Sequence, residues 1–175
     1  MLIYIYAEQE AWVKWGGEKS GTFIIVNGTR QGSVLSPALF SVYIDELIGE
    51  LRKVGLGCHM AGLWVGACGF ADDIILLAPG RSAMAKMLSV CEDYARKNNL
   101  HFSTDPNPSK SKSKCVFMTG PRLRNIPKPA PLQLYGVDLP WVASATHLGH
   151  KLHQDCSMDY DSKCKRGRFI KTALP

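Results

Sequence analysis

The sequence lacks the features that mark secreted, membrane-spanning and repeat proteins. No apolar run reaches the about 20 residues that a transmembrane helix needs, and no internal repeat is found. Residues 1–6 show neither a basic leader nor a small-residue cleavage site, so we expect a chain that stays inside the cell, nuclear or cytoplasmic and not secreted. The six cysteines form no CxxC pair, which favours reduced thiols over a disulfide framework. With 46% hydrophobic residues in 175, the chain is long enough for one modest core.

Basic charge is concentrated in the second part of the chain. Residues 1–100 hold 9 Lys and Arg side chains against 10 Asp and Glu, whereas residues 101–175 hold 12 against 5. An excess of this kind favours a polyanionic partner, most simply a nucleic acid. A solvated basic surface without a partner is the alternative interpretation of the charge alone.

The adjacent pair Asp72 and Asp73 is the most informative feature of the sequence. It lies between two apolar runs, Leu63–Gly69 and Ile74–Ala78, which predict two buried strands joined by a tight turn. Neighbouring carboxylates repel each other and are costly to bury, so a divalent cation is their natural partner. Oxygen ligands that leave room for phosphate suit Mg²⁺ or Mn²⁺. The alternative is an ordinary hairpin whose turn contains two aspartates.

Three further blocks accompany this pair in a fixed order. Upstream lies Asn27–Phe40, which contains Arg-Gln-Gly and Leu-Ser-Pro, and downstream lie Asn107–Lys112 and His147–Gly149. Together with Phe-Ala-Asp-Asp at 70–73, the four blocks resemble those of reverse transcriptases, in particular the enzymes of non-LTR (LINE-type) retrotransposons. The resemblance covers nearly the whole chain and implies RNA-directed DNA synthesis by two-metal nucleotidyl transfer.

The resemblance also implies a role for individual residues. Asp72 and Asp73 would be catalytic carboxylates that bind metal, with Asp72 as the principal ligand. Lys110 is the best candidate for the catalytic lysine near the triphosphate, although Lys112 and Lys114 compete for that role. The residues implied in binding nucleic acid or nucleotide are Arg30, Gln31, Gly32, Ser36, Phe70, Ala71, His147, Leu148 and Gly149. The implied partners are an RNA template, a DNA primer and a deoxynucleoside triphosphate, with no membrane.

The family pattern also implies components that the sequence does not contain. Reverse transcriptases carry a third metal-binding Asp, which by family spacing would lie upstream of Met1, as would the fingers and the rest of the palm of the same polyprotein. We therefore expect the isolated chain to have no measurable polymerase activity. The alternative is a catalytically dead transposon relic that at most binds nucleic acid through its basic C-terminal half.

The expected fold is α+β, a partial polymerase palm in which helices pack on one face of an antiparallel sheet. Residues 1–155 would form this palm, and residues 156–175 the start of a helical thumb or a basic tail. The expected helices are the end of one within 1–19, one from Ser36 to Gly55, one over 82–98 and a basic amphipathic segment over 158–174. The expected strands are 20–28, the two beside Asp72, 114–118 and a hairpin within 132–152.

A second metal site is conceivable because His147, His150, His153 and Cys156 recur at every third residue. On a helix such residues share a face and would suit Zn²⁺. However, Gly149 and the resemblance of this block favour a strand and a turn, which would scatter the ligands.

Overall fold

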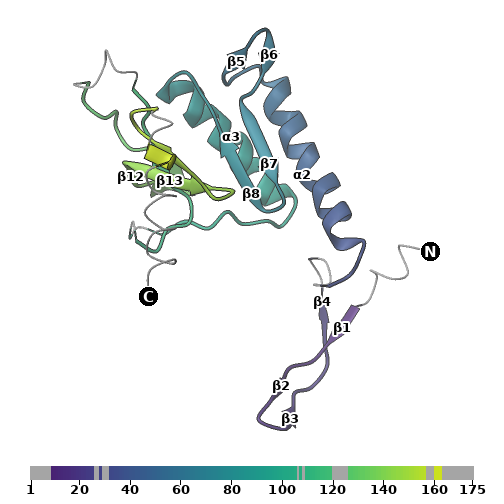
Figure 1. Cartoon of the computed structure of the whole chain (residues 1–175). Coiled ribbons are helices and arrows are strands. Elements are labelled where there is room, and N and C mark those ends of the chain that lie inside the picture. The colour runs from purple at the N-terminus through teal and green to yellow at the C-terminus, as the bar shows by residue number, and fades with distance from the viewer. Residues whose placement is uncertain are drawn as a thin grey trace. The chain divides into compact units, whose positions relative to one another are not determined.

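The computed structural model describes residues 9–25, 28, 32–105, 107, 109–119, 126–156 and 160–162 (Figure 1). Within these ranges two long helices and a helical turn at 160–162 accompany short strands, so the described chain is α+β. The chain divides into two compact units, 1–47 and 48–175, and each is described by itself below. None of the described helices is long and apolar enough to cross a membrane. The predicted segment 158–174 lies outside the described residues except for 160–162.

The N-terminal unit begins with a two-stranded antiparallel ribbon. Its strands are β1 (Gln9–Ala11), β2 (Lys14–Trp15), β3 (Glu18–Lys19) and β4 (Phe23–Ile25), with β1 paired to β4 and β2 to β3. The helix predicted to end within 1–19 is therefore wrong for residues 9–19. The physical reason is Gly16–Gly17, whose φ angles of +54° and +94° make the two-residue turn that favours a hairpin. The strand predicted over 20–28 is confirmed at β4.

Helix α2 (Ser36–Lys53) begins and ends where the sequence predicts. Pro37 lies in the first turn, where its fixed φ suits a helix and its missing N–H costs nothing. The helix ends before Gly55, which has φ +70° and donates its N–H to the Arg52 carbonyl at 3.0 Å. The buried residues of α2 are Ser36, Ile44, Leu47 and Leu51.

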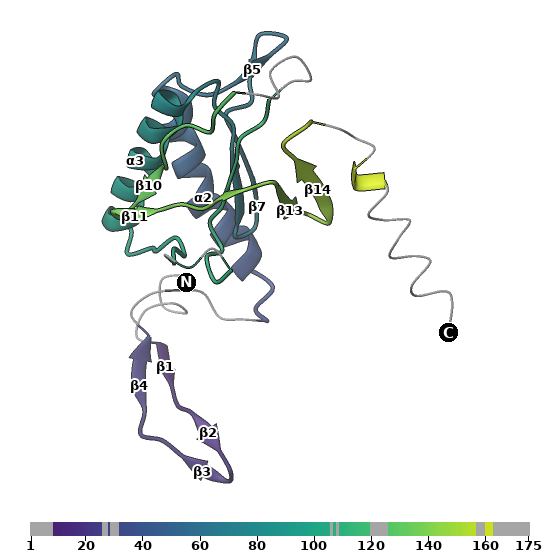
Figure 2. The same ribbon diagram turned by 90° about the vertical axis from the view of Figure 1, so that its left-hand side faces the viewer.

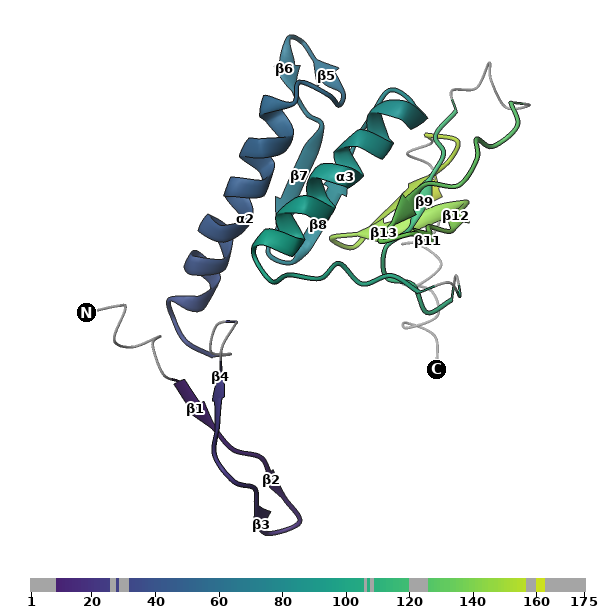
Figure 3. The same ribbon diagram turned by 180° about the vertical axis from the view of Figure 1, so that it is seen from behind.

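The second unit contains two successive hairpins followed by a helix. β5 (His59–Met60) pairs with β6 (Leu63–Trp64), and β7 (Ala67–Phe70) pairs with β8 (Asp73–Leu76), both antiparallel. Helix α3 (Arg81–Lys97) follows and runs alongside β7 and β8 (Figures 1 and 3). The prediction of a helix over 82–98 is confirmed. The predicted apolar stripe is confirmed as well, with Met87, Leu88, Cys91, Tyr94 and Ala95 buried.

The strands after α3 pair in a way that differs from the expected single antiparallel sheet. They are β9 (Cys115–Val116), β10 (Gln133–Leu134), β11 (Val137–Asp138), β12 (Trp141–Val142), β13 (Ser144–His147) and β14 (His150–His153). β10 pairs with β11 and β13 with β14 as antiparallel hairpins, whereas β12 pairs with β9 in parallel. Over the described residues, all strands form two-stranded ladders. Part of the predicted sheet is thus a set of separate hairpins.

A compact apolar cluster holds the second unit together. Leu88 of α3 packs with Leu132, Leu134 and Leu139 around β10 and β11, which lie against α3 in Figure 2. Leu76 of β8 packs against the same cluster. The full set of partly buried residues around it is Leu76, Met84, Phe102, Cys115, Tyr135 and Trp141. Because residues from β8, α3 and β10 share one core, the β7–β8 hairpin has a fixed support.

Polar bonds connect the same elements. Arg81 donates from Nε to the Ala130 carbonyl at 2.8 Å and from Nη2 to the Pro131 carbonyl at 2.9 Å. The carboxylate of Glu92 accepts the Tyr135 N–H at 2.6 Å. These bonds fasten both ends of the 130–135 segment to α3.

Candidate active site

The two aspartates lie at the tip of the β7–β8 hairpin. Phe70 pairs with Asp73, so Ala71 and Asp72 form the two-residue connection, and Ala71 has φ +51°. All four residues are exposed, Phe70 to 63%. The predicted turn is confirmed, but the prediction of buried strands is wrong for the tip: Cys68, like Phe70, is exposed, and full burial in β7 is limited to Ala67. Burial would desolvate the carboxylates, and exposure avoids that cost.

The base of this hairpin is closely packed. The Trp64 indole N–H donates to the Leu56 carbonyl at 2.6 Å, and a Cβ on Gly66 would lie 2.6 Å from the Trp64 ring. A Cβ on Gly57 would lie 2.7 Å from the Gly66 Cα, and Gly57 has φ +111°. Only glycine allows backbone and indole to approach this closely. These contacts explain why the apolar run Leu63–Gly69 divides into β6 and β7.

The carboxylates of Asp72 and Asp73 offer oxygen ligands for a divalent cation. Within the described part of the chain, neither has a hydrogen-bond or ion-pair partner. The same part contains no group of three or more His, Cys, Asp or Glu side chains that would hold a metal ion. The donor set therefore fits a hard cation that takes its remaining ligands from water, substrate or a carboxylate elsewhere. A divalent metal ion is also what the resemblance to reverse transcriptases implies.

Two residues of the predicted Arg-Gln-Gly block, Arg30 and Gln31, lie outside the described residues. Gly32 is exposed and has φ +83°, a conformation that glycine adopts without strain. Space around its Cα is open, since a Cβ there would meet no atom within 4 Å. Ser36 is 8% exposed and is the first residue of α2, so it lies in the helix start rather than on an open surface.

The loop with the predicted lysine is held by its own hydrogen bonds. Asn107 accepts from the backbone N–H of Ser109 at its side chain, and from those of Lys110 and Ser111 at its carbonyl, each at 3.0 Å. Ser111 is 2% exposed and donates its hydroxyl to the Ser113 carbonyl. Lys110, Lys112 and Lys114 are all exposed and alternate with these serines. The loop thus presents three lysines, and nothing in their surroundings selects Lys110 over the other two.

The block His147–Gly149 closes the β13–β14 hairpin. Leu148 and Gly149 have φ +48° and +78°, and His147 pairs with His150 across the turn. The predicted strand and turn are confirmed, whereas binding of nucleic acid by these residues stays a prediction.

The histidines near this turn have other partners than a metal. His150 Nδ1 lies 3.1 Å from a carboxylate oxygen of Asp161, and His153 Nδ1 lies 3.3 Å from one of Asp155. No group of zinc ligands occurs among the described residues. His147 and His150 lie opposite each other across the turn, so the hairpin brings this pair of the repeat together without adding a third ligand from the described residues.

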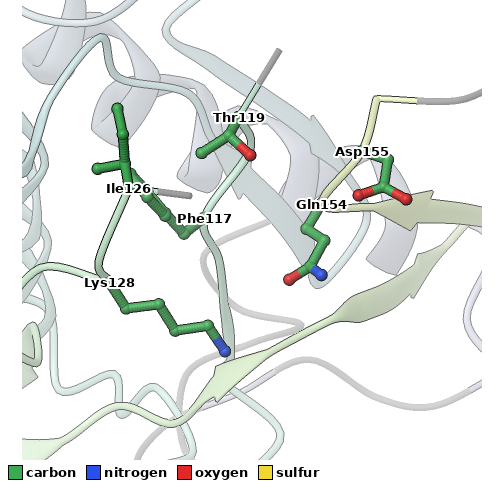
Figure 4. Close-up of a pocket in the computed structure, with 6 residues that line it drawn as sticks. All are labelled: Phe117, Thr119, Ile126, Lys128, Gln154 and Asp155. Carbon is green, nitrogen blue, oxygen red and sulfur yellow. The ribbon is translucent and has the colours of Figure 1, made fainter. Parts of the chain in front are cut away.

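Sequence reasoning did not predict a cavity beyond β14, which is drawn in Figure 4. It has a volume of about 280 Å³ and is lined by Phe117, Thr119, Ile126, Lys128, Gln154 and Asp155. The Thr119 N–H donates to the Gln154 carbonyl at 3.0 Å, which joins two of the three segments that line it. These segments are far apart in sequence and share no motif, so no local signal could have revealed the cavity.

Two cysteines of the second unit, Cys91 and Cys115, have thiols of low reactivity. Burial, with a smaller contribution from the neighbouring charge of Glu92, raises the pKa of the Cys91 thiol to about 12. Burial raises the pKa of Cys115 to about 11. Neither thiol is a nucleophile near neutral pH, because the reactive thiolate is scarce.

Comparison with known proteins identifies the family to which the chain belongs. Residues 4–152 match the family described as "Reverse transcriptase (RNA-dependent DNA polymerase)". The chain belongs to this family. The match includes the aspartate hairpin, the lysine loop and nearly all of β13–β14.

Individual relatives agree with the family match. The chain is 30% identical over 118 residues, 66% of its length, to a "Retrovirus-related Pol polyprotein from type-1 retrotransposable element R2" of Popillia japonica, and covers 18% of it. It is 30% identical over 89 residues to a "Retrovirus-related Pol polyprotein from type-2 retrotransposable element R2DM" of Drosophila melanogaster, over 51% of the chain and 8% of the relative. A type-1 R2 polyprotein of Nasonia vitripennis is 40% identical over 73 residues, 42% of the chain and 7% of that protein. The chain thus spans less than a fifth of these relatives. R2 elements are non-LTR retrotransposons, as the sequence predicted.

Proposed function

We propose that this chain forms part of the RNA-directed DNA polymerase of an R2-like non-LTR retrotransposon, acting inside the cell. The observation that carries the proposal is the pair of exposed carboxylates at the tip of a hairpin with a packed base. A palm needs this combination, because carboxylates must reach substrate while their backbone stays in place. Residues 1–155 would belong to the palm, and the fingers and the rest of the palm to the same polyprotein.

Asp72 and Asp73 would hold Mg²⁺, or Mn²⁺ in its place, with Asp72 as the principal ligand. Two metal ions held there would supply activation of the primer 3′-hydroxyl and neutralisation of the charge on the triphosphate. The exposure of both carboxylates leaves room for a primer end and a nucleotide. The small side chain of Ala71 keeps the tip narrow. A third carboxylate from elsewhere in the polyprotein would complete the ligand set.

The other predicted residues would bind the substrates. Lys110, or its neighbours Lys112 and Lys114, would shield charge on the triphosphate or donate a proton to pyrophosphate. Arg30, Gln31, Gly32 and Ser36 would position template and nucleotide. Phe70 would flank the primer end, and His147, Leu148 and Gly149 would contact the primer strand. Lys110 would act from a loop that Asn107 already orders, so little entropy would be lost on binding.

A second candidate function is binding of nucleic acid without catalysis. The specific observation in its favour is that the described residues contain no group of three metal ligands. The basic excess of residues 101–175 would then supply the affinity.

The first test compares Asp72→Asn with Asp93→Asn in the 175-residue chain. Asp93 is an exposed carboxylate of α3, 71% accessible, and serves as the matched control. We expect Mn²⁺ binding, followed by electron paramagnetic resonance, to weaken about tenfold or more in Asp72→Asn and to stay unchanged in Asp93→Asn. Equal binding by both variants would favour the second candidate function.

Primer extension provides the second readout. We expect none from the isolated chain, because two carboxylates leave the ligand set incomplete. Extension that is seen and is abolished by Asp72→Asn would correct that expectation and still support the catalytic role.

A further inference from the structure

The β1–β4 ribbon carries large apolar side chains in water. Trp12 is 52% exposed and Trp15 is 85% exposed. Phe23 and Ile24 on the opposite strand are 49% and 62% exposed. A two-stranded ribbon has marginal stability by itself, and exposed aromatic residues at this density mark a binding surface.

The charges of the ribbon are separated between its two faces. Lys14 lies directly opposite Lys19, and Trp15 lies directly opposite Glu18. The Lys19 ammonium lies 3.9 Å from the centre of the Trp12 ring, which places Trp12 on the face of Lys19 and of its cross-strand partner Lys14. One face therefore holds an indole and two lysines, while the other pairs an indole with a carboxylate.

We propose that the face formed by Trp12, Lys14 and Lys19 binds single-stranded nucleic acid. A base would stack on the Trp12 indole, and the two ammonium groups would bind the flanking phosphates. The occupant follows from charge: two lysines placed directly opposite repel each other, and an anion between them removes that cost. The proposal rests on the proposed function, in which this strand is the template.

The contact between Lys19 and Trp12 gives the face a simple way to accept a base. In the free chain the ammonium covers the indole by a cation–π contact, which is worth little at an exposed site. An incoming base would take the place of the ammonium over the ring, and the ammonium would move to a phosphate. Both partners are thus paired before and after binding, so neither state leaves an uncovered charge or ring.

A second copy of the chain is a poorer occupant. Pairing of two such faces would bring four lysines together against at most the two copies of Glu10, since Glu18 lies on the opposite face. Like charges placed together in this way cost free energy rather than supply it.

The test measures binding of a fluorescein-labelled oligouridylate to the 175-residue chain by fluorescence anisotropy at several salt concentrations. Trp12→Ala is expected to raise Kd about five- to a hundredfold, as loss of one stacked base does. In the double variant Lys14→Gln/Lys19→Gln, the slope of log K against log salt is expected to become shallower by about 1.4, since each phosphate contact on a single strand contributes about 0.7.

Matched controls separate the two faces and the two proposals. Trp15→Ala lies on the other face, and Lys86→Gln removes an exposed lysine of α3, so both are expected to leave Kd within twofold (about 0.4 kcal/mol, from RT ln 2). Asp72→Asn is expected to lose Mn²⁺ binding and keep RNA binding, whereas the Trp12 and lysine variants do the reverse. Failure of the metal-binding proposal can therefore be told apart from failure of the RNA-binding proposal.

Three results would overturn the proposal. One is equal Kd values for Trp12→Ala and Trp15→Ala, and another is an unchanged salt slope in the double lysine variant. The third is a dimer, seen by sedimentation, that Trp12→Ala dissociates. If circular dichroism shows that Trp12→Ala does not fold, Lys19→Gln serves as the test instead, because it keeps the indole. This variant must still make the slope of log K against log salt shallower by about 0.7.

Discussion

The β1–β4 ribbon and the β7–β8 hairpin are both two-stranded and antiparallel, yet they are supported in different ways. At the base of β7–β8, Trp64 and Gly66 are in close contact, and Leu76 packs on the cluster around Leu88. In the ribbon, by contrast, Trp12, Trp15 and Phe23 remain exposed. The β7–β8 hairpin, which holds the aspartates, packs its apolar side chains against its own unit. The ribbon leaves its large apolar side chains exposed.

This difference indicates two kinds of role. Carboxylates with the proposed catalytic role need fixed positions, and the hairpin that carries Asp72 and Asp73 is supported at its base and exposed at its tip. A surface for a flexible strand needs exposed aromatic and basic groups instead, and tolerates a weakly supported backbone.

The largest effect is expected from removal of the support of the hairpin. Leu88→Ala leaves a cavity among Leu76, Leu132 and Leu134, and should lower the free energy of unfolding by about 2–5 kcal/mol. Trp15→Ala in the ribbon removes an 85% exposed side chain and should change the free energy of unfolding by less than about 0.5 kcal/mol. Urea unfolding of both variants checks the comparison. Similar values for the two would show that the ribbon is as well packed as the core.

A smaller effect is expected from the polar links of α3. Arg81→Gln removes two hydrogen bonds to the carbonyls of 130 and 131, and should cost about 1–2 kcal/mol. Arg96→Gln on the same helix removes an exposed ion pair to Asp93 at 3.5 Å, and should cost at most about 0.5 kcal/mol. Thermal melts of the two variants give the difference directly. A loss at Arg96 as large as that at Arg81 would contradict this ranking of the α3 contacts.

The smallest effect concerns the turns. Leu148 has φ +48°, a conformation that Leu adopts with strain and Asn with little. Leu148→Asn should therefore stabilise the β13–β14 hairpin by up to about 1 kcal/mol, measured as a rise in Tm. Leu148→Val is the opposite control and should lower Tm, because a branched side chain suits a positive φ least.

The elements that the sequence predicted correctly depend on local signals. Ser36–Pro37 and Gly55 bound α2, and the aspartate turn between two apolar runs is short and self-contained. The errors arose where a local signal was outweighed or absent. Gly16–Gly17 is a strong hairpin signal, but the aromatic and charged residues around it suggested a helix.

Pairing between distant segments could not be predicted in the same way. The parallel pairing of Cys115 with Trp141 joins segments 26 residues apart. No residue in either segment indicates with which other segment it will pair. Of the candidate site, the turn that holds Asp72 and Asp73 was predicted from the sequence, whereas the exposure of Cys68 and Phe70 beside it was not. The close packing at Gly57 and Gly66 depends on contacts that form only in the folded chain.

That packing also fixes which residues of β7 and β8 pair with each other. The Leu77 N–H donates to the Gly66 carbonyl at 2.7 Å, and this bond lies just beyond the pairing of Ala67 with Leu76. A shift of the pairing by one residue would turn the Asp73 side chain to the opposite face of the hairpin. A single change at Gly66 would thus misplace the Asp73 carboxylate without altering either aspartate in the sequence.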